Sequence, residues 1–500
     1  MSAQTFDILV IGGGIHGAAI ARDAAGRGLK VMLAERHDYA GATSSASSKL
    51  IHGGLRYLER LDLKLVRESL SERAELLRTA PHLVVPLKFL LPLFDWQKRS
   101  ALFVHAGLAL YDLLSFGDGL PASGRLADEE CTRLPRLRQE NLSAVLHYPD
   151  CQADDARLTL SVALDARARG ADIGNNRAVT ALSPRKDGFT ATLQERGTTR
   201  DVDARFIVNT AGPFVAEVDA MTHAVPPPQD LRLVRGSHIV LPMPEPACPY
   251  AYTLQDEGER IIFVMPWLQD RFLIIGTTDV PQDGNPGTAE CSPDETAYLL
   301  AAYNRYFASP DGPARSEDIV FTWSGLRALQ GRADEAASRI NRDVTLETKS
   351  RGNGGFLTLI GGKLTTHRAT AEQALDRLKS LGLAMGPAWT KGVPLYGGAK
   401  SREALLVEAD EGPKSILART RARWALTYGD RVEDLFARIH EDPASAEEIA
   451  PGVPRAELEH AVTAEDARTP EDFLLRRTKL HLLLNEDGRA RIGEWFAKNL

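Results

Sequence analysis

The sequence is poor in the features that mark metal-dependent, disulfide-rich or nucleic-acid-binding proteins. Only four of its 500 residues are cysteines, and no two of them have the CxxC spacing of a zinc site or redox pair. The 60 basic residues are outnumbered by 67 acidic ones, which gives a net charge of −7. Binding to duplex nucleic acid usually needs a dominant basic face. We therefore expect no metal site, no nucleic-acid partner and a reducing compartment.

Long apolar runs are also missing. No stretch reaches the roughly 20 apolar residues that a membrane-spanning helix needs, and Asp7 interrupts the N-terminal apolar run, unlike a signal peptide. The composition, 43% hydrophobic and 25% charged, is that of an ordinary globular protein. The chain is long enough for about two or three domains. We expect an intracellular protein that does not cross a bilayer.

Glycines are concentrated near the N-terminus, in LVIGGGIHGA (9–18). Gly12, Gly14 and Gly17 have the G-x-G-x-x-G spacing, between a predicted buried strand and a predicted helix. Such glycines permit a tight turn, a close approach of the backbone to a pyrophosphate, and close packing of helix on strand. A second predicted strand ends at Glu35, where an acid can bind ribose hydroxyls. This pattern predicts an adenine dinucleotide site.

Two later predicted strands also end in glycine. They lie in ARFIVNTAGPF (204–214) and in GGFLTLIGGKLTTHRATAEQAL (354–375), where a helix is expected to open at Thr365 and Thr366. A helix N-terminus with threonine caps suits a negatively charged group. Three glycine-edged strand ends far apart in sequence indicate one long ligand held across a sheet, and FAD has that length.

Several blocks resemble a known family, the FAD-dependent glycerol-3-phosphate dehydrogenases of the respiratory (aerobic) type, a branch of the glutathione-reductase-like flavoproteins. They include GGGIHGAAIARDAAGRG, SSKLIHGGLRYLE, RGSHIVLP, IGTTD, WSGLRAL and IGGKLTTHRATAEQAL. The resemblance spans residues 7 to about 399, and SSKLIHGGLRYLE is its most specific block. The sequence departs from the family pattern at His16, His367 and Ala328, where we expect Asn, Tyr and Pro.

The resemblance implies FAD as cofactor and the oxidation of sn-glycerol 3-phosphate to dihydroxyacetone phosphate. Hydride passes to flavin N5, and the electrons pass on to a membrane quinone. The implied fold is α/β and α+β. It comprises a discontinuous Rossmann-type FAD-binding domain (1–80, 150–225 and 335–385), an antiparallel-sheet cap or substrate-binding region (81–149 and 226–334), a linker (386–400) and a helical C-terminal domain (401–500).

The resemblance also assigns site residues. Cofactor contacts are expected from Gly12, Gly14, Gly17, Glu35, Thr43, Ser44, Ser48, Lys49, Leu50, Ala211, Gly212, Gly362, Lys363, Leu364 and Thr365. Substrate contacts are expected from Arg56, Tyr57, Thr278, Arg327 and Lys363. Two arginines and a lysine suit a phosphate dianion, because guanidinium groups bind its oxygens bidentately. The residues that the resemblance implies act in catalysis are His52, Arg56, Arg327 and Lys363. His52 is the candidate base, although a neighbouring cation is an alternative, and the remaining histidines are interpreted as structural or surface residues.

The apolar segment 82–116 has two interpretations. It carries Trp96 beside Lys98 and Arg99 and is broken by two prolines. Such a segment can lie in the headgroup layer of a membrane or form ordinary core. Because a quinone acceptor lives in the bilayer, we expect a cytoplasmic protein attached peripherally to the cytoplasmic membrane. A homodimer remains open.

Three other functions compete with this interpretation. An oxidase would pass the electrons to dioxygen, and an amine or amino-acid oxidase of the same fold would bind a carboxylate, for which one arginine usually suffices. A carrier protein would keep the fold without binding a flavin.

Overall fold

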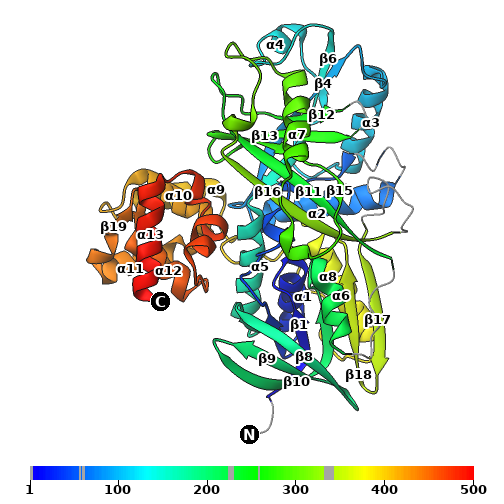
Figure 1. Ribbon diagram of the computed structural model, residues 1–500, viewed down its shortest axis with the longest axis vertical. Helices are drawn as coiled ribbons and strands as arrows, with labels where there is room; N and C mark the ends of the chain where they lie inside the picture. Colours follow the sequence, from blue (N-terminus) through cyan, green and yellow to red (C-terminus); the bar gives the residue numbers. More distant parts are fainter. Residues whose placement is uncertain (1–3, 56–57, 59–61, 223–229, 257–259, 332–342) are drawn as a thin grey trace.

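The computed structural model describes residues 4–55, 58, 62–222, 230–256, 260–331 and 343–500. Two large sheets are stacked along the long axis, and a helical unit lies to one side (Figure 1). These are the α/β sheet, the cap sheet and the helical C-terminal domain that the sequence predicts.

The first sheet has a parallel centre. Its order is β17-β18-β10-β1-β2-β7, with β8 and β9 forming a meander beside β10. The strands are β1 (Gln4–Ile11), β2 (Val31–Ala34), β7 (Asp172–Gly174), β8 (Arg177–Arg185), β9 (Gly188–Glu195), β10 (Thr198–Asn209), β17 (Thr345–Arg351) and β18 (Gly354–Ile360). β1, β2, β7, β10 and β18 pair in parallel, whereas β17 pairs antiparallel at the edge. The three glycine-edged strands are therefore the neighbours β18, β10 and β1.

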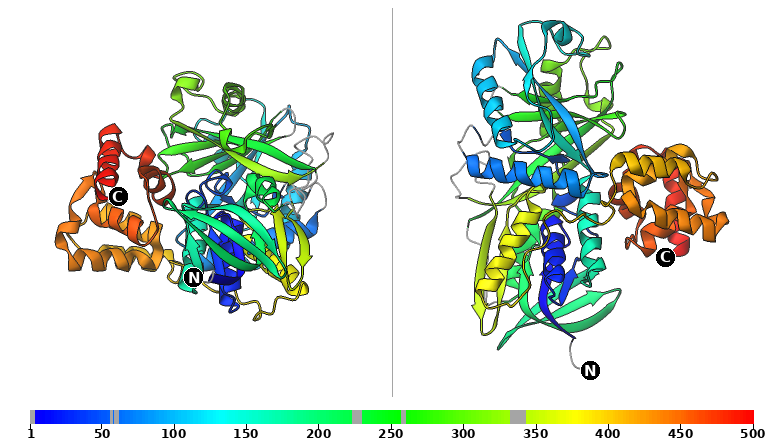
Figure 2. Two further views of the ribbon diagram at one scale, coloured as in Figure 1. Left: turned by 60° about the horizontal axis from the view of Figure 1, so that its bottom comes forward. Right: turned by 180° about the vertical axis from the view of Figure 1, so that it is seen from behind.

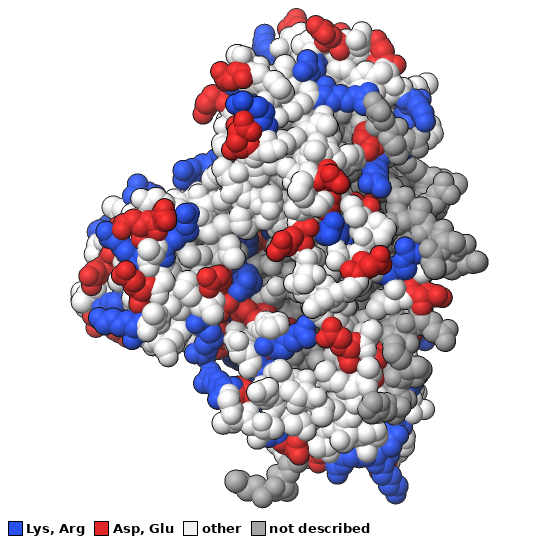
Figure 3. Space-filling model, in the orientation of Figure 1, with Lys and Arg blue, Asp and Glu red and all other residues white. Residues whose placement is uncertain are grey.

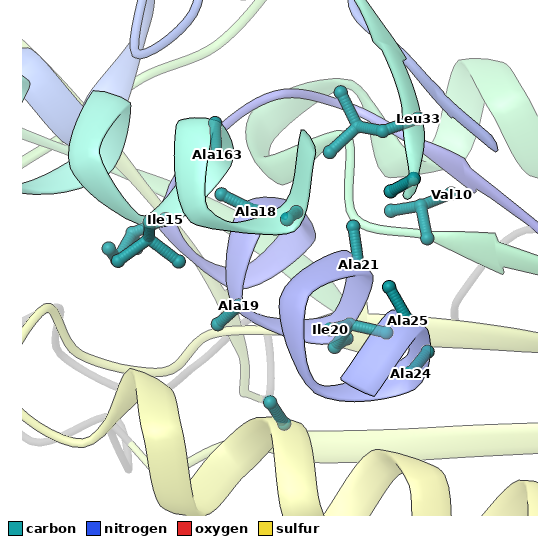
Figure 4. Packing of buried hydrophobic residues seen from close by; sticks show 14 of the residues in the cluster. Val10, Ile15, Ala18, Ala19, Ile20, Ala21, Ala24, Ala25, Leu33 and Ala163 are labelled. Carbon is teal, nitrogen blue, oxygen red and sulfur yellow. The ribbon is translucent and has the colours of Figure 1, made fainter. Parts of the chain in front are cut away.

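Helix α1 (Ile15–Gly26) is buried on all sides. It lies between this sheet and the helices α5 (Asp155–Ala168) and α8 (His367–Ser380), and small side chains such as Ala18, Ala21 and Ala24 make its surface (Figure 4). Alanine has the highest helix propensity and lets neighbouring backbones approach closely. The helix that follows the glycine turn is thus held rigidly against the sheet.

The second sheet has ten strands and forms the upper lobe in Figure 1. They are β3 (Leu50–Ile51), β4 (Val84–Phe94), β5 (Gly124–Arg125), β6 (Leu142–Ala153), β11 (Leu231–Pro242), β12 (Ala251–Gln255), β13 (Ile261–Trp267), β14 (Phe272–Gly276), β15 (Val280–Pro281) and β16 (Phe321–Gln330). The pairing is antiparallel except between β4 and β12. β3 pairs with the end of β6, so the chain enters the second sheet at Leu50, earlier than the expected boundary at residue 81.

Shorter helices complete this lobe and the junction between the sheets. They are α2 (Leu63–Thr79), α3 (Ala101–Leu114), α4 (Asp128–Thr132), α6 (Val215–Ala220) and α7 (Pro293–Tyr306). α7 begins with a capping box, in which the Ser292 hydroxyl accepts from the Glu295 amide and the Glu295 carboxylate accepts from the Ser292 amide.

The C-terminal unit is mostly helical, as its composition predicts. It contains α9 (Arg402–Glu411), α10 (Ala418–Tyr428), α11 (Val432–Glu441), α12 (Arg455–Thr463), α13 (Glu486–Asn499), the short strands β19 (Glu448–Ala450) and β20 (Val453–Pro454), and a π-helical turn, Asp472–Arg477. It has hydrophobic clusters of its own and lies beside α5 (Figures 1 and 2).

The charged surface is mixed. Basic and acidic side chains alternate over the face shown in Figure 3, without a single-sign field. Across the described ranges, the helices are too short or too polar to traverse a bilayer.

Candidate active site

A cavity of about 1490 Å³ runs from the ends of the first-sheet strands to the face of the second sheet. The carboxyl ends of β1, β10 and β18 open into it, because parallel neighbours end at the same edge. Of the cofactor residues expected from the sequence, the structure places these on its wall: Gly12, Gly14, Glu35, Thr43, Ser44, Ser48, Leu50, Ala211, Gly212, Gly362, Lys363, Leu364 and Thr365. Segments far apart in sequence thus build one elongated site.

The glycine turn after β1 is shaped by close contacts. Gly12 has φ +110°, and a Cβ there would lie 2.7 Å from the Thr210 carbonyl oxygen. A Cβ at Gly17 would lie 1.9 Å from the Gly12 carbonyl oxygen, so only glycine fits where α1 meets the turn. Gly17 itself does not line the cavity. Its effect on ligand binding is therefore indirect, because it permits the close packing of α1 against the turn.

Glu35 ties the end of β2 to this turn. Its carboxylate accepts the Gly13 amide at 2.6 Å and the His37 amide at 2.8 Å. A carboxylate has about four lone-pair sites, so two backbone bonds leave acceptor capacity for ribose hydroxyls. Burial raises the pKa of Glu35, against the effect of those amide bonds.

The serine-rich loop after β2 crosses the cavity wall. The Ser44 hydroxyl accepts the Ile15 amide at 3.0 Å, and the Ser48 hydroxyl lies 2.9 Å from His238 Nε2. Lys49, also expected to contact the cofactor, is not among the residues that line the cavity. Its ammonium lies away from the cavity, 2.9 and 3.0 Å from the two Asp155 carboxylate oxygens, because a buried cation needs an anionic partner.

The third glycine turn brings its chain back toward α1. Gly361 and Gly362 have φ +78° and +86°, and a Cβ at Gly362 would lie 2.3 Å from His16 Nε2. Helix α8 begins after Thr366, whose side chain makes no capping bond, so the expected threonine cap is wrong. The Thr365 hydroxyl instead accepts the His52 amide at 3.3 Å. The turn thus connects the cofactor strand to the candidate base.

Charged and titratable groups expected to bind the substrate line the cavity. His52, Lys363 and Arg327 are among its lining residues. Arg327 Nη1 donates to Asp279 at 2.9 Å, and its Nη2 lies 3.5 Å from the Thr277 hydroxyl. These groups come from both sheets. Arg56 and Tyr57, also expected here, lie outside the described residues.

Thr278 is not a cavity residue, contrary to expectation. Its neighbours Thr277 and Asp279 line the cavity, whereas the Thr278 hydroxyl donates to Glu295 at 2.6 Å and accepts the Ser237 amide at 2.9 Å. Along an extended chain, successive side chains point to opposite sides. The Thr278 side chain therefore faces Glu295, and its two neighbours in the motif face the cavity.

His238 is one of the cavity residues that the sequence interpretation missed. It is 1% exposed, and its ring stacks on Trp323 with centroids 4.9 Å apart. Burial lowers the pKa of His238 well below 6.5, helped by the charges of Arg327 and Lys49, so the ring is neutral. A histidine in the apolar run RGSHIVLP was the available signal, since polar residues in a central strand are usually bonded.

The residues present fit FAD. The glycine turns let the protein backbone approach the cofactor closely. Helix α1 begins after Gly14, which has no side chain to cap it, and Glu35 follows the end of β2. Helix N-termini bind phosphates through free amides and the helix dipole. FAD bound in this cavity would supply a hydride acceptor there.

Comparison with known proteins identifies the family of the chain. A model of the FAD dependent oxidoreductases matches residues 7–368, and a model of the C-terminal domain of alpha-glycerophosphate oxidase matches residues 388–496. The glycerol-3-phosphate dehydrogenase of Pseudomonas aeruginosa is 42% identical, with 99% of this chain and 95% of the relative covered. The aerobic glycerol-3-phosphate dehydrogenase of Escherichia coli is 38% identical, with 99% and 98% covered.

Two further relatives bear on the site. The D-erythritol 1-phosphate dehydrogenase of Brucella abortus is 39% identical, with 99% of this chain and 98% of the relative covered. The crystal structure of the Bacillus halodurans glycerol-3-phosphate dehydrogenase complexed with FAD superposes with a TM-score of 0.75 at 28% identity, covering 100% and 95% of the two chains. The chain therefore belongs to the FAD-dependent oxidoreductases, in the family of the aerobic glycerol-3-phosphate dehydrogenases.

Proposed function

We propose that the protein oxidises sn-glycerol 3-phosphate to dihydroxyacetone phosphate. The observation that carries this proposal is that Arg327 from the second sheet and Lys363 from the first line one cavity. A phosphate dianion suits such a pair, because charge-assisted bonds to guanidinium and ammonium are strong. The names of the relatives support the same substrate.

Each group has a role in this proposal. Arg327 and Lys363 bind the phosphate, and Asp279 fixes the Arg327 guanidinium through its 2.9 Å bond. FAD supplies the two-electron acceptor for the hydride that leaves the substrate carbon. His52 takes the hydroxyl proton, with its backbone held by Thr365. The neutral His238 is the second candidate base, since an uncharged imidazole can accept a proton.

A substrate panel with a soluble dye acceptor tests the proposal. The enzyme should show its highest kcat/KM with sn-glycerol 3-phosphate and almost none with glycerol, which lacks the phosphate. D-erythritol 1-phosphate, named in a relative, belongs in the same panel. A preference for amino acids would contradict the proposal and favour an amino-acid oxidase.

We further propose that the electrons pass to a quinone at a membrane surface. Helix α3 supports this, because an apolar stripe runs along its outer side. Its members are Leu102, Ala106, Ala109, Leu113 and, just beyond the helix end, Phe116. Leu102, Leu113 and Phe116 are 80%, 71% and 94% exposed. Large exposed apolar side chains in one stripe mark an interaction surface.

The cavity continues beneath the same helix. Val104 and Leu110 of α3 and Leu91 and Leu93 of β4 line this part of the wall, and Gln97 and Arg99 also line the cavity. A hydrophobic acceptor leaving the bilayer at α3 would meet these four apolar side chains. The ring of Trp96 is 38% exposed and packs on Phe94, with the Arg305 guanidinium 3.8 Å from the ring centroid, so its membrane role stays a prediction.

The acceptor is tested by oxidising the reduced enzyme with a short-chain quinone or with dioxygen. Rapid anaerobic reduction of the quinone and slow formation of hydrogen peroxide are expected. Fast peroxide formation, with little quinone reduction, would identify an oxidase instead.

A further inference from the structure

The C-terminal unit (401–500) contributes no described residue to the cavity, yet it is bonded to the loop that lines it. In this loop, which follows β2, Glu35–His37 and Ala40–Ser48 lie on the cavity wall. Asp38 and Tyr39, between them, do not. Their side chains lie on the opposite side of the loop and contact the C-terminal unit.

Asp38 is the centre of this contact. Its two carboxylate oxygens accept from Arg477 Nη1 at 2.6 Å and Nη2 at 2.7 Å, and one also accepts from Arg476 Nε at 2.5 Å. Asp38 and Arg477 are 4% and 1% exposed. Burial alone would raise the pKa of Asp38, but the charges of Arg477 and Arg476 outweigh it and lower that pKa. The pair is therefore ionised.

Tyr39 gives a second contact beside the first. Its hydroxyl donates to Asp466 of the C-terminal unit at 3.1 Å. Asn175, at the end of β7, donates to both Asp38 and the Asp466 carbonyl oxygen at 2.9 Å. The ring of Tyr39 lies under the glycine turn, where a Cβ at Gly13 would meet it at 3.1 Å. Tyr39 thus links the C-terminal unit to the glycine turn after β1.

Lys49 gives a third contact at the far end of the loop. Its partner Asp155 stands at the start of α5, beside Asp154, which accepts from Lys479 of the C-terminal unit at 2.9 Å. Arg157, in the first turn of α5, donates from its Nη1 to both carboxylate oxygens of Glu465, at 2.7 Å each. The C-terminal unit lies on the side of the first sheet that carries helix α5 (Figures 1 and 2).

We propose that the C-terminal unit clamps the flavin-binding loop, and that Arg477 is a positioning residue for the adenosine end of FAD. Arg477 acts through Asp38, which follows Glu35 by three residues in the same loop. When the clamp is closed, Glu35, Ser44 and the Gly12–Gly14 turn keep the geometry that binds the dinucleotide. The inference rests on the assignment of Glu35 to the ribose.

Coupling of this kind is reciprocal: if the clamp tightens FAD binding, bound FAD must tighten the clamp to the same degree. A purely structural pair would stabilise the fold without distinguishing the flavin-loaded from the flavin-free protein. The flavin-release rate and the flavin dependence of hydrogen exchange in the π-helical turn separate the two roles.

The test uses the full-length holoenzyme and three variants. Arg477→Gln opens the clamp. Arg423→Gln is the matched control, since Arg423 makes a bidentate pair with Glu457 at 2.5 and 2.6 Å entirely inside the same unit. Glu35→Ala tests the ribose assignment. Release of FAD after dilution is followed by the fluorescence of the free cofactor, at temperatures where circular dichroism shows every variant folded.

FAD should leave Arg477→Gln about tenfold faster than the wild type, a change within the usual range of coupling between sites. The Arg423→Gln rate should equal the wild-type rate. Amides of residues 472–484 should exchange more slowly with FAD bound in the wild type, and equally fast with or without it in Arg477→Gln. Faster release from Glu35→Ala but not from Arg477→Gln overturns the clamp alone. Unchanged release from both overturns the ribose assignment and the clamp with it.

Discussion

At the residue scale, Arg327 is the side chain that most directly distinguishes substrate binding from cofactor binding. It lies on the second sheet, where it is paired with Asp279. Arg327→Ala should lower kcat/KM for sn-glycerol 3-phosphate by about tenfold to a hundredfold, because it removes one charge-assisted contact and leaves Asp279 uncompensated near the phosphate. The FAD-to-protein ratio should not change. A colourless variant with normal kinetics in its remaining holoenzyme would place Arg327 in the cofactor site.

Thr278, next to the Arg327 partner Asp279, is expected to affect stability and not substrate binding. Thr278→Val removes a hydroxyl that serves Glu295 and the Ser237 amide, both buried. Unfolding free energy should fall by about 1–3 kcal/mol, the usual cost of leaving buried polar groups unpaired. The kcat/KM should stay close to that of the wild type. A large rise in KM without loss of stability would restore Thr278 to the substrate site.

Glu35 is the residue on which the cofactor assignment depends. Glu35→Ala removes the acceptor of the Gly13 and His37 amides together with the expected ribose contact. The variant should lose FAD on extensive dialysis, with substrate preference unchanged in the fraction that keeps it. A wild-type ratio of flavin to protein would remove Glu35 from the cofactor site.

At the element scale, helix α3 carries the membrane proposal. The triple variant Leu102→Ser, Leu113→Ser, Phe116→Ser should no longer float with liposomes at low salt, while its activity with a soluble dye stays intact. Its matched control is Val407→Ser, which changes an exposed apolar residue, 60% accessible, on the C-terminal unit. Flotation should rest on local apolar insertion, because the net charge of −7 opposes attraction to anionic lipid. If the wild type remains at the bottom of the gradient, α3 is no membrane anchor.

Elements with a strong local signal were predictable from the sequence. The strands β1 and β18 end in apolar segments that glycine follows directly, and β10 ends in the short apolar segment 206–208 with Gly212 shortly after it. The turn between β13 and β14 falls at the predicted Leu268–Asp270, all three with positive φ. The segment 82–116 was ambiguous because its strand and helix are equally apolar. Only the tertiary packing separates β4, which is core, from α3, whose outer face is exposed.

Side-chain direction was the part that the sequence could not provide. Lys49 and Thr278 lie in correctly recognised motifs, but each points away from the cavity to a partner far along the chain, Asp155 and Glu295. His238 was passed over because nothing local shows that its strand faces the cavity. Such contacts depend on how distant segments meet, which a motif does not encode.

At the scale of the whole molecule, buried histidines set the response to acid. His82 and His367 are 4% and 3% exposed, and burial lowers the pKa of each from 6.5 to about 3. Between these values the unfolded chain binds protons that the folded protein excludes. The free energy of unfolding should therefore be unaffected by them above pH 6.5, and fall below it by up to about 1.4 kcal/mol per histidine per pH unit.

Thermal unfolding at pH 7, 6 and 5 measures this effect. The wild type should lose stability progressively on acidification, and His82→Gln should show a shallower dependence, since one titrating group is gone. Equal slopes in the two proteins would show that His82 titrates normally in the fold.

The proposed function requires one cavity that brings a flavin next to a phosphate-bearing alcohol. The most direct measurement is the visible absorption spectrum of the purified protein before and after the anaerobic addition of sn-glycerol 3-phosphate. We expect a yellow protein whose flavin band is bleached rapidly by this substrate and not by glycerol. A protein that binds no flavin, or whose flavin band is unchanged by sn-glycerol 3-phosphate, would contradict it.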